Sequence, residues 1–332
     1  MNIHPALVLE PRSREVRLSG QLRERLVARQ DDLARWIETA VAPFRFRIVE
    51  TPAGARLEGD EVAIMLAAGM LEQIGAAEAA SRTMDSDAVK AMMSSVVDHN
   101  LKHDLAFRLD GLAHPVRPMS MGQVAFMGEL LSKGKSLIIG CGPTGTGKTH
   151  LAITAGLNLL ALGHVKHMVI TRPHVMMEGE VVTPASRQET EYDEQFIVFE
   201  DILRDLVGFK EFGRLVDQRL LEITPLGRMR GRTFNDSYIV IDEAQNMTLR
   251  KMRMAVTRIG KNSRMVVTGD AAQTDLRGDE LSGLSHLLQM VEGQDIATIH
   301  RFESSEIVRN RIVARLEELF ARQGEAVSAF AA

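Results

Sequence analysis

The chain has 332 residues, a length that predicts about two domains and a sizeable buried core. Apolar residues make up 45% and charged residues 25% of the sequence, which excludes disordered, collagenous and disulfide-stapled proteins. Lysine and arginine (40) and aspartate and glutamate (44) leave a formal charge of −4, so a uniformly basic surface that coats DNA is not expected.

The cysteine content and the N-terminus bear on the cellular compartment. Cys141 is the one cysteine, so no internal disulfide forms, and a reducing compartment, the cytoplasm, is expected. Charged residues interrupt 1–19, which therefore lacks the apolar centre of a signal peptide. No run approaches the ~20 uninterrupted apolar residues of a spanning helix, so we expect no membrane segment.

Residues 1–80 predict a small α/β domain. The expected elements are a strand at 16–19, a helix at 21–41, strands at 44–48 and 55–57, and a helix at 60–74. Such a unit could be a KH-type RNA-binding module, but the Gly-x-x-Gly loop of that type is missing. RNA binding and a packing or assembly role are therefore both left open for this unit.

The next segment, 81–118, predicts a helical linker that ends where Pro115 and Pro118 interrupt helical geometry. The main domain is expected at 119–325 and a flexible tail at 326–332. Within the main domain, runs that are apolar on both faces predict buried parallel strands joined by helices. These strands are expected at 136–139, 167–171, 238–241, 265–268 and 296–299, with a weaker one at 220–223.

A loop of the form G-x-x-x-x-G-K-[ST] stands between a predicted strand and a predicted helix. Its residues are Gly142, Pro143, Thr144, Gly145, Thr146, Gly147, Lys148 and Thr149. Glycines let backbone N–H groups surround phosphate oxygens at a helix N-terminus. Lys148 is expected to reach the β- and γ-phosphates, and the Thr149 hydroxyl to bind Mg²⁺. The expected fold class is α/β: a doubly wound parallel-sheet P-loop NTPase (RecA-like) core with a small N-terminal α/β domain.

Residues 140–145 also satisfy the dinucleotide-binding pattern G-x-G-x-x-G. That alternative needs a carboxylate at the end of the next strand, where this chain has Thr171 and Arg172, and it gives Lys148 no role. The P-loop interpretation is therefore favoured. Cys141 is expected to pack beneath the loop rather than to act as a nucleophile.

An apolar strand at 238–241 is followed by two carboxylates, Asp242 and Glu243, the form of a Walker B motif. Asp242 would hold the Mg²⁺ shell, and Glu243 would orient and polarise an attacking water. Because a phosphotransferase needs a bound acceptor rather than an activated water, Glu243 favours hydrolysis over transfer to a small molecule. A plain acidic helix start is the alternative for this pair.

A further strand ends in Thr268, Gly269 and Asp270 and is followed by Gln273. In parallel sheets these groups fall on the same carboxyl edge as Asp242, where ligands bind. Gln273 is therefore a candidate sensor of the γ-phosphate or of the attacking water. The alternative is an ordinary turn.

These motifs resemble the PhoH-like P-loop ATPase family, which is related to the core of superfamily 1 helicases. The resemblance covers most of 119–323 and, more weakly, the N-terminal unit. The segments that carry it are 142–149, 229–236, 241–246, 257–260, 267–276, 301–302 and 308–309.

The resemblance implies Mg²⁺-dependent ATP hydrolysis, a link to RNA metabolism and a ring-shaped homo-oligomer. It also implies that Gln123 reads adenine, as a glutamine does in helicase relatives. RNA helicase activity is one form of the expected function. The alternative is a nucleotide-gated adaptor that recruits an RNA-processing nuclease, since no nuclease domain is apparent in the sequence.

The chain departs from the family pattern after Arg172, where 178–194 is acidic. Arginine-rich stretches at 228–232 and 250–264 predict RNA contacts, an arginine finger that acts on a neighbouring subunit, or a solvated basic face. Arg232, Arg258 and Arg309 are the candidates for such a finger.

Overall fold

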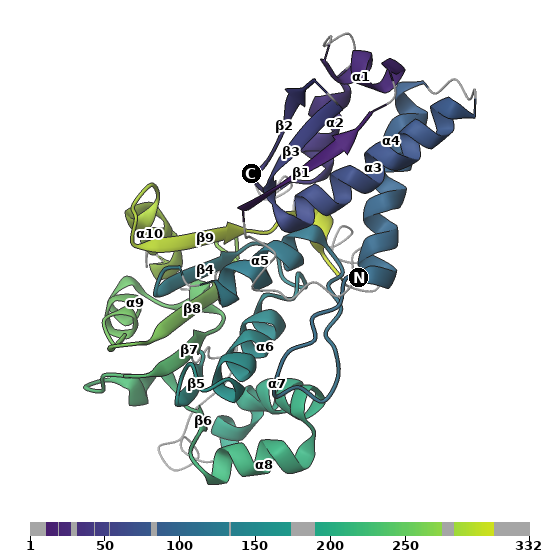
Figure 1. The fold of residues 1–332 in the computed structure, drawn as a ribbon. Helices are drawn as coiled ribbons and strands as arrows, with labels where there is room; N and C mark the ends of the chain where they lie inside the picture. The colour runs from purple at the N-terminus through teal and green to yellow at the C-terminus, as the bar shows by residue number, and fades with distance from the viewer. Residues whose placement is uncertain are drawn as a thin grey trace, which may run out of the picture.

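A computed structural model describes most of the chain as two sheets with their helices (Figure 1). The described residues are 11–18, 20–27, 32–42, 44–52, 54–80, 85–132, 134–173, 190–273 and 282–308. The predicted tail and Arg309 lie outside these ranges, as do Asp275 and most of the acidic segment 178–194.

The N-terminal sheet has three antiparallel strands in the order β1-β3-β2. β1 spans Pro11–Arg17, β2 spans Phe46–Thr51 and β3 spans Gly54–Asp60. Four helices accompany these strands: α1 (Gly20–Val27), α2 (Leu33–Ala40), α3 (Glu61–Ala79) and α4 (Ser86–His99). A small α/β unit therefore precedes the main sheet.

The single helix expected over 21–41 is wrong, because the structure has two helices there, α1 and α2. Leu22 and Leu26 are buried from α1, and Leu33 and Ile37 from α2. The step of seven residues from Leu26 to Leu33 equals nearly two helical turns, so the apolar stripe keeps its phase. The periodicity therefore could not reveal the break.

Helix α3 forms the centre of the N-terminal core, with ten of its side chains buried. Among the described helices it is the one whose length and composition would suffice to cross a bilayer, and 56% of its apolar window is buried. The sequence predicts no membrane segment, because no run approaches ~20 uninterrupted apolar residues. Its burial against its own domain accounts for the apolar composition.

Within the predicted helical linker, 81–118, helix α4 packs against α2 and α3. Val89, Met93 and Val96 of α4 are buried in the same cluster as α2 and α3. A π-helical turn, Asn100–Asp104, follows, and Phe107 then pairs with Val116 in an isolated antiparallel bridge. The sharp domain limits remain a prediction.

The main sheet has six parallel strands in the order β6-β5-β7-β8-β4-β9, as predicted for a doubly wound α/β core. The strands are β4 (Leu137–Cys141), β5 (His167–Thr171), β6 (Leu221–Ile223), β7 (Ser237–Ile241), β8 (Arg264–Gly269) and β9 (Ala297–Arg301). β8 lies between the strand that leads into the P-loop and the strand that ends at Asp242. Their carboxyl ends therefore meet at one edge.

The central strands β4, β5, β7 and β8 are buried on both faces, which is why they are largely apolar, whereas the edge strands β6 and β9 are only partly buried. In β7, Tyr238 and Val240 belong to the cluster that includes α5, α6 and α7, whereas Ile239 and Ile241 face α9 and α10. Figure 1 shows α9 and α10 on the left of the sheet. The helices are α5 (Met121–Leu131), α6 (Lys148–Ala161), α7 (Thr190–Val207), α8 (Phe209–Asp217), α9 (Leu249–Val256) and α10 (Gly283–Val291).

Asp60 is expected to be the carboxylate on which the N-terminal unit depends most. Its side chain is 2% exposed, accepts a hydrogen bond from the Arg45 backbone N at 2.8 Å, and binds the Arg45 guanidinium at 2.7 and 3.1 Å. Asp60→Ala should therefore lower the free energy of unfolding by about 1–3 kcal/mol in chemical denaturation. Glu15→Ala is the control: the Glu15–Arg56 pair is exposed and should contribute less than ~1 kcal/mol. Equal losses would contradict the prediction.

Candidate nucleotide-binding site

The predicted P-loop connects β4 to α6 in the expected strand–loop–helix arrangement. Gly145 and Gly147 have φ of 87° and 82°, in the left-handed region that glycine adopts without a steric penalty. The loop thereby turns back over the first turn of α6. Free N–H groups at that helix end favour an anion such as a phosphate.

Lys148 is buried with its ammonium folded into the loop. Its Nζ donates to the carbonyl oxygens of Gly142 and Pro143, both at 2.6 Å, and lies 3.2 Å from Thr146 Oγ1. Burial lowers the pKa of Lys148, and nearby carboxylates, with Asp270 the strongest, oppose this shift. The cation is thus held where phosphate oxygens can replace the carbonyl groups.

One oxygen of Asp242 joins the P-loop to two strands of the sheet. Its Oδ1 accepts hydrogen bonds from the Thr149 hydroxyl at 2.6 Å and the Thr268 hydroxyl at 2.7 Å. Thr149 lies in the first turn of α6, Asp242 follows β7 and Thr268 lies near the end of β8. The sheet order brings the three side chains together, as predicted for Thr149 and Asp242.

The same oxygens fit Mg²⁺, which prefers hard oxygen ligands and usually binds through one or two carboxylates together with substrate phosphates. The Thr149 hydroxyl and the Asp242 carboxylate already converge within 2.6 Å. In the part of the chain that the structure describes, no group of three or more His, Cys, Asp or Glu side chains forms a metal cage. Phosphate oxygens and water would therefore have to complete the Mg²⁺ shell.

Glu243 occupies a strained backbone position, with φ 51° and ψ 40°. Its Oε2 accepts a hydrogen bond from Gln245 Nε2 at 2.5 Å, and its Oε1 lies 3.5 Å from Nη2 of Arg172. The carboxylate is one-third exposed. It is thus fixed in orientation and remains accessible to water.

Asp270 and Gln273 follow β8 at the same edge, as expected. Asp270 is buried, and its backbone N donates to Gln245 Oε1 at 3.1 Å. Gln273 is exposed, and its Oε1 accepts a long hydrogen bond, 3.4 Å, from Thr144 Oγ1 of the P-loop. Gln273 therefore lies beside the loop, and its role as a sensor stays a prediction.

Gln123 lies against the P-loop, with both ends of its amide engaged. Its Nε2 donates to the Thr146 carbonyl at 3.0 Å, its Oε1 accepts from the Met119 backbone N at 2.7 Å, and the residue is 6% exposed. In this geometry Gln123 supports the phosphate loop. Its predicted contact with adenine would require exchange of one of these bonds.

The segment after β9 also supports this region, a contact that the sequence did not predict. Glu306 Oε1 accepts hydrogen bonds from Ser120 Oγ at 3.0 Å and from Gly122 N at 2.8 Å. The Val308 N–H donates to the Gly145 carbonyl at 2.9 Å. Contacts that span 184 and 186 residues of chain therefore fix the helix that carries Gln123, and the Val308 contact fixes the loop.

The structure describes two of the three arginines that the sequence suggested as fingers, Arg232 and Arg258. Arg232 makes a double hydrogen bond with Glu222, 2.7 Å for each, and Arg258 donates to the carbonyl oxygens of Met254 and Arg232. Both precede strands β7 and β8, so they lie toward the amino edge, away from the P-loop of their own chain. A role on a neighbouring subunit stays a prediction for each.

Two residues at the site, Arg172 and Gln245, had no predicted role, and Thr268 was expected at this edge but not as a hydrogen-bond partner of Asp242. Arg172 immediately follows β5, the neighbour of β7, so its position at the carboxyl edge of a predicted strand was the available signal. Gln245 and Thr268 gave a weaker signal, because their contacts depend on which strands are adjacent.

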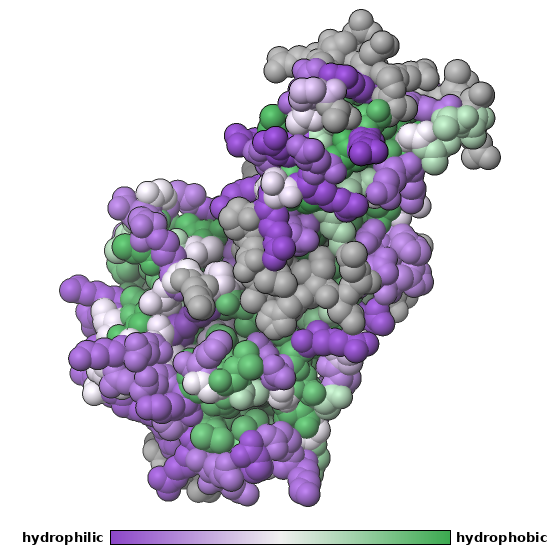
Figure 2. Space-filling model, in the orientation of Figure 1, coloured by the Kyte–Doolittle hydropathy of each residue, from purple (hydrophilic) through white to green (hydrophobic). Residues whose placement is uncertain are grey.

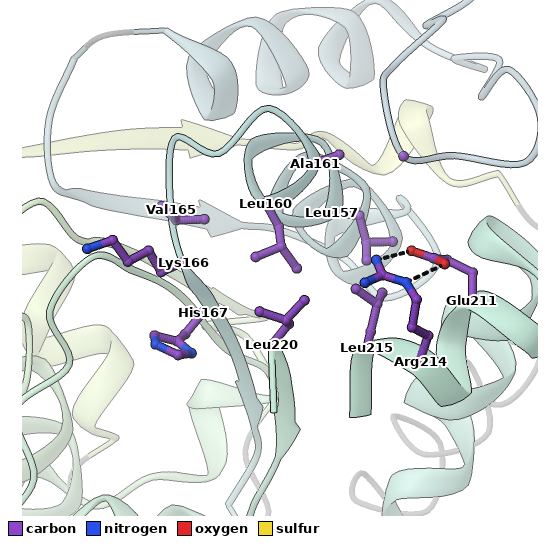
Figure 3. A pocket seen from close by; sticks show the side chains of 11 residues that line it. Leu157, Leu160, Ala161, Val165, Lys166, His167, Glu211, Arg214, Leu215 and Leu220 are labelled. Atoms are coloured by element: carbon purple, nitrogen blue, oxygen red, sulfur yellow. Dashed lines mark hydrogen bonds and ion pairs between the residues drawn. The ribbon is translucent and has the colours of Figure 1, made fainter. Parts of the chain in front are cut away.

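A separate cavity of about 500 Å³ opens near the amino edge of the sheet (Figure 3). Aliphatic side chains from α6, α8 and the segment before β6 line it, and the Glu211–Arg214 pair stands at its side. Figure 2 shows apolar side chains gathered in the region where Figure 1 draws α6 and α7. The cavity is distinct from the P-loop, which lies at the other end of α6.

These features define a protein of the P-loop NTPase class. They are the six-stranded parallel sheet, the strand–loop–helix, and the convergence of Thr149, Asp242 and Thr268. The family model described as PhoH-like protein matches residues 115–321. The chain belongs to the PhoH-like protein family.

Three relatives illustrate the similarity. A PhoH-like protein of Bacillus subtilis (strain 168) is 36% identical over 209 residues, which cover 63% of this chain and 65% of that protein. A PhoH-like protein of Mycobacterium bovis is 30% identical over 271 residues, 80% of this chain and 76% of the relative. Protein PhoH of Escherichia coli (strain K12) is 30% identical over 203 residues, 60% and 57% of the two chains. The family generally comprises ATP-binding proteins.

Gln123→Ala should weaken the binding of ATP and GTP by a similar factor, because the described contact is with the P-loop backbone rather than with a base. The loss of a hydrogen bond of this kind corresponds to roughly a tenfold change in affinity. Titration calorimetry with both nucleotides measures it, and Gln218→Ala on the exposed end of α8 is the control. A loss confined to ATP would show instead that Gln123 reads adenine.

Nucleotide affinity should fall at alkaline pH earlier than an ordinary lysine would allow. Burial lowers the pKa of Lys148, so the ammonium loses its proton below the usual lysine range and then no longer attracts phosphate. At pH values below that pKa, Lys148 stays protonated and should cause no change of nucleotide affinity with pH. Calorimetry in buffers of different ionisation enthalpy should detect proton uptake on binding, and an affinity that stays flat through the alkaline range would contradict the prediction.

Proposed function

We propose that the protein binds ATP with Mg²⁺, hydrolyses it, and couples hydrolysis to RNA remodelling or processing. The observation that carries the hydrolysis proposal is the convergence of Lys148, the Thr149–Asp242–Thr268 group and Glu243 at one sheet edge. A phosphate-binding cation, an oxygen ligand set and an accessible carboxylate are the parts that hydrolysis of a γ-phosphate needs.

In the proposed mechanism the P-loop N–H groups and Lys148 hold the β- and γ-phosphates. Thr149 and Asp242 hold Mg²⁺, which when bound neutralises charge on the phosphate oxygens. Glu243 orients a water for attack on the γ-phosphorus and accepts its proton. The position of Glu243, fixed by Gln245, sets the direction of that attack.

The RNA part of the proposal is supported by the resemblance and by the exposed basic residues of the main domain. They are Arg228, Arg230, Arg250, Lys251, Arg253 and Lys261. Such side chains can neutralise RNA phosphates and would make binding sensitive to salt. RNA helicase activity, a homo-oligomeric ring, an RNA-processing nuclease as partner and a cytoplasmic location remain parts of this proposal.

ATP turnover should distinguish the residues that bind from the one that activates water. Lys148→Ala should weaken nucleotide binding, whereas Glu243→Gln should still bind ATP and hydrolyse it at least ~10²-fold more slowly. Lys210→Ala, on an exposed face of α8, is the control. Undiminished turnover in Glu243→Gln would remove its proposed role.

The same assay separates the coupled functions. Stimulation of wild-type turnover by RNA supports remodelling, whereas stimulation only by a nuclease partner supports the adaptor alternative. ATP consumption that requires a small acceptor would indicate phosphoryl transfer instead of hydrolysis.

A further inference from the structure

Arg172 reaches the proposed hydrolysis site from the strand next to the Walker B strand. β5 and β7 pair in register with Thr171 beside Ile241, and the Asp242 N–H donates to the Thr171 carbonyl at 2.9 Å. Arg172 and Asp242, which follow these two residues, therefore leave the sheet at the same carboxyl edge. This places a guanidinium and two carboxylates together.

The guanidinium of Arg172 faces both carboxylates of the Walker B motif. Its Nη2 lies 3.5 Å from Glu243 Oε1 and 4.0 Å from Asp242 Oδ2. Its central carbon lies 5.4 Å from the ring centre of Phe199 in α7, a side chain with no exposed surface. The Arg172 side chain is one-fifth exposed, so it is well packed yet open to a ligand that enters beside Glu243.

In P-loop NTPases an arginine finger commonly adds a cation that stabilises the charge on the transferred phosphoryl group, beyond the groups that bind the β- and γ-phosphates. Arg232 and Arg258 lie toward the opposite edge of the sheet, and both hydrogen-bond within their own chain. Arg172 already lies beside the residue that would hold the attacking water. Among the described arginines, the positions thus favour a finger from the same subunit as the P-loop.

We propose that Arg172 is the arginine that contacts the transferred phosphoryl group, and that it acts in the same chain whose P-loop holds the nucleotide. This inference rests on the proposed hydrolysis of ATP. The water oxygen bonds to the γ-phosphorus, and the bond from that phosphorus to the bridging oxygen breaks, leaving its electron pair on ADP. The water proton passes to Glu243, and the Arg172 guanidinium stabilises the charge on the equatorial oxygens.

The proposal also assigns Arg172 a second position. In this structure it pairs with Glu243 Oε1, the oxygen opposite the one that Gln245 binds. The γ-phosphate is an anion that competes for the same guanidinium, so its arrival frees Oε1 to accept the water proton. Nucleotide binding and activation of Glu243 are thereby linked through one side chain.

The first test compares full-length variants in ATP turnover. Arg172→Ala should reduce the maximal rate by about 10³-fold with little change in ADP affinity, and Arg172→Lys should restore only part of it, because lysine lacks the planar fork. Added guanidinium ion should partly rescue Arg172→Ala. Arg214→Ala, which removes an exposed arginine beside the distant cavity, is the control. A wild-type rate in Arg172→Ala overturns the proposal.

The second test asks whether the arginine acts within its own chain. Arg172→Ala is mixed with Glu243→Gln, so that each subunit lacks a different group. If Arg172 acts in its own chain, mixing restores no activity. If activity recovers on mixing, the arginine comes from a neighbouring subunit and the proposal is wrong.

The third test separates contact with phosphate from mere positioning of Glu243. Affinity for ADP with aluminium fluoride, a mimic of the transferred phosphoryl group, is measured for Arg172→Ala in the wild-type and Glu243→Gln backgrounds. A direct contact predicts a loss of about 10²-fold or more in both backgrounds, with ADP affinity unchanged. If Glu243→Gln abolishes the loss, Arg172 only positions Glu243 and the proposal is overturned.

Absence of ATP hydrolysis by wild type would refute the proposed function, whereas the fluoride complex would still report on Arg172.

Discussion

The two hydrogen bonds on Asp242 Oδ1 are the interaction on which the site depends. They connect the first turn of α6, the end of β7 and the end of β8 through a single oxygen. They require β8 to lie between β4 and β7, and that order is stabilised by apolar side chains on both faces.

The charges at this edge explain why a nucleotide would bind together with a divalent cation. Two cations, Lys148 and Arg172, lie among three carboxylates, Asp242, Glu243 and Asp270, so the described cluster carries a net charge of 2 − 3 = −1. A triphosphate brings several more negative charges into a partly buried space, where charge repulsion is screened weakly. Mg²⁺ held by Thr149 and Asp242 would offset part of that negative charge.

The sequence predicted the main sheet well, because each buried strand is an unbroken apolar run and the P-loop glycines stand at fixed spacing. β5 and the strand–loop–helix were placed almost to the residue. Adjacency of strands has no local signal, so the contacts of Thr268 and Gln245 could not be predicted. The break between α1 and α2 was missed for a related reason, since their apolar residues stay in phase.

The residues around Glu243 hold its backbone in a strained conformation. A left-handed conformation costs about 1–2 kcal/mol for a residue with a side chain, so it persists only where neighbours fix it. Gln245 does so by binding Glu243 with its amide nitrogen and the Asp270 backbone N–H with its amide oxygen. A larger side chain at Gly269 would displace that amide, because a Cβ there would lie 2.6 Å from its oxygen. Gly269, at the end of the neighbouring strand β8, therefore helps to fix the orientation of the Glu243 carboxylate.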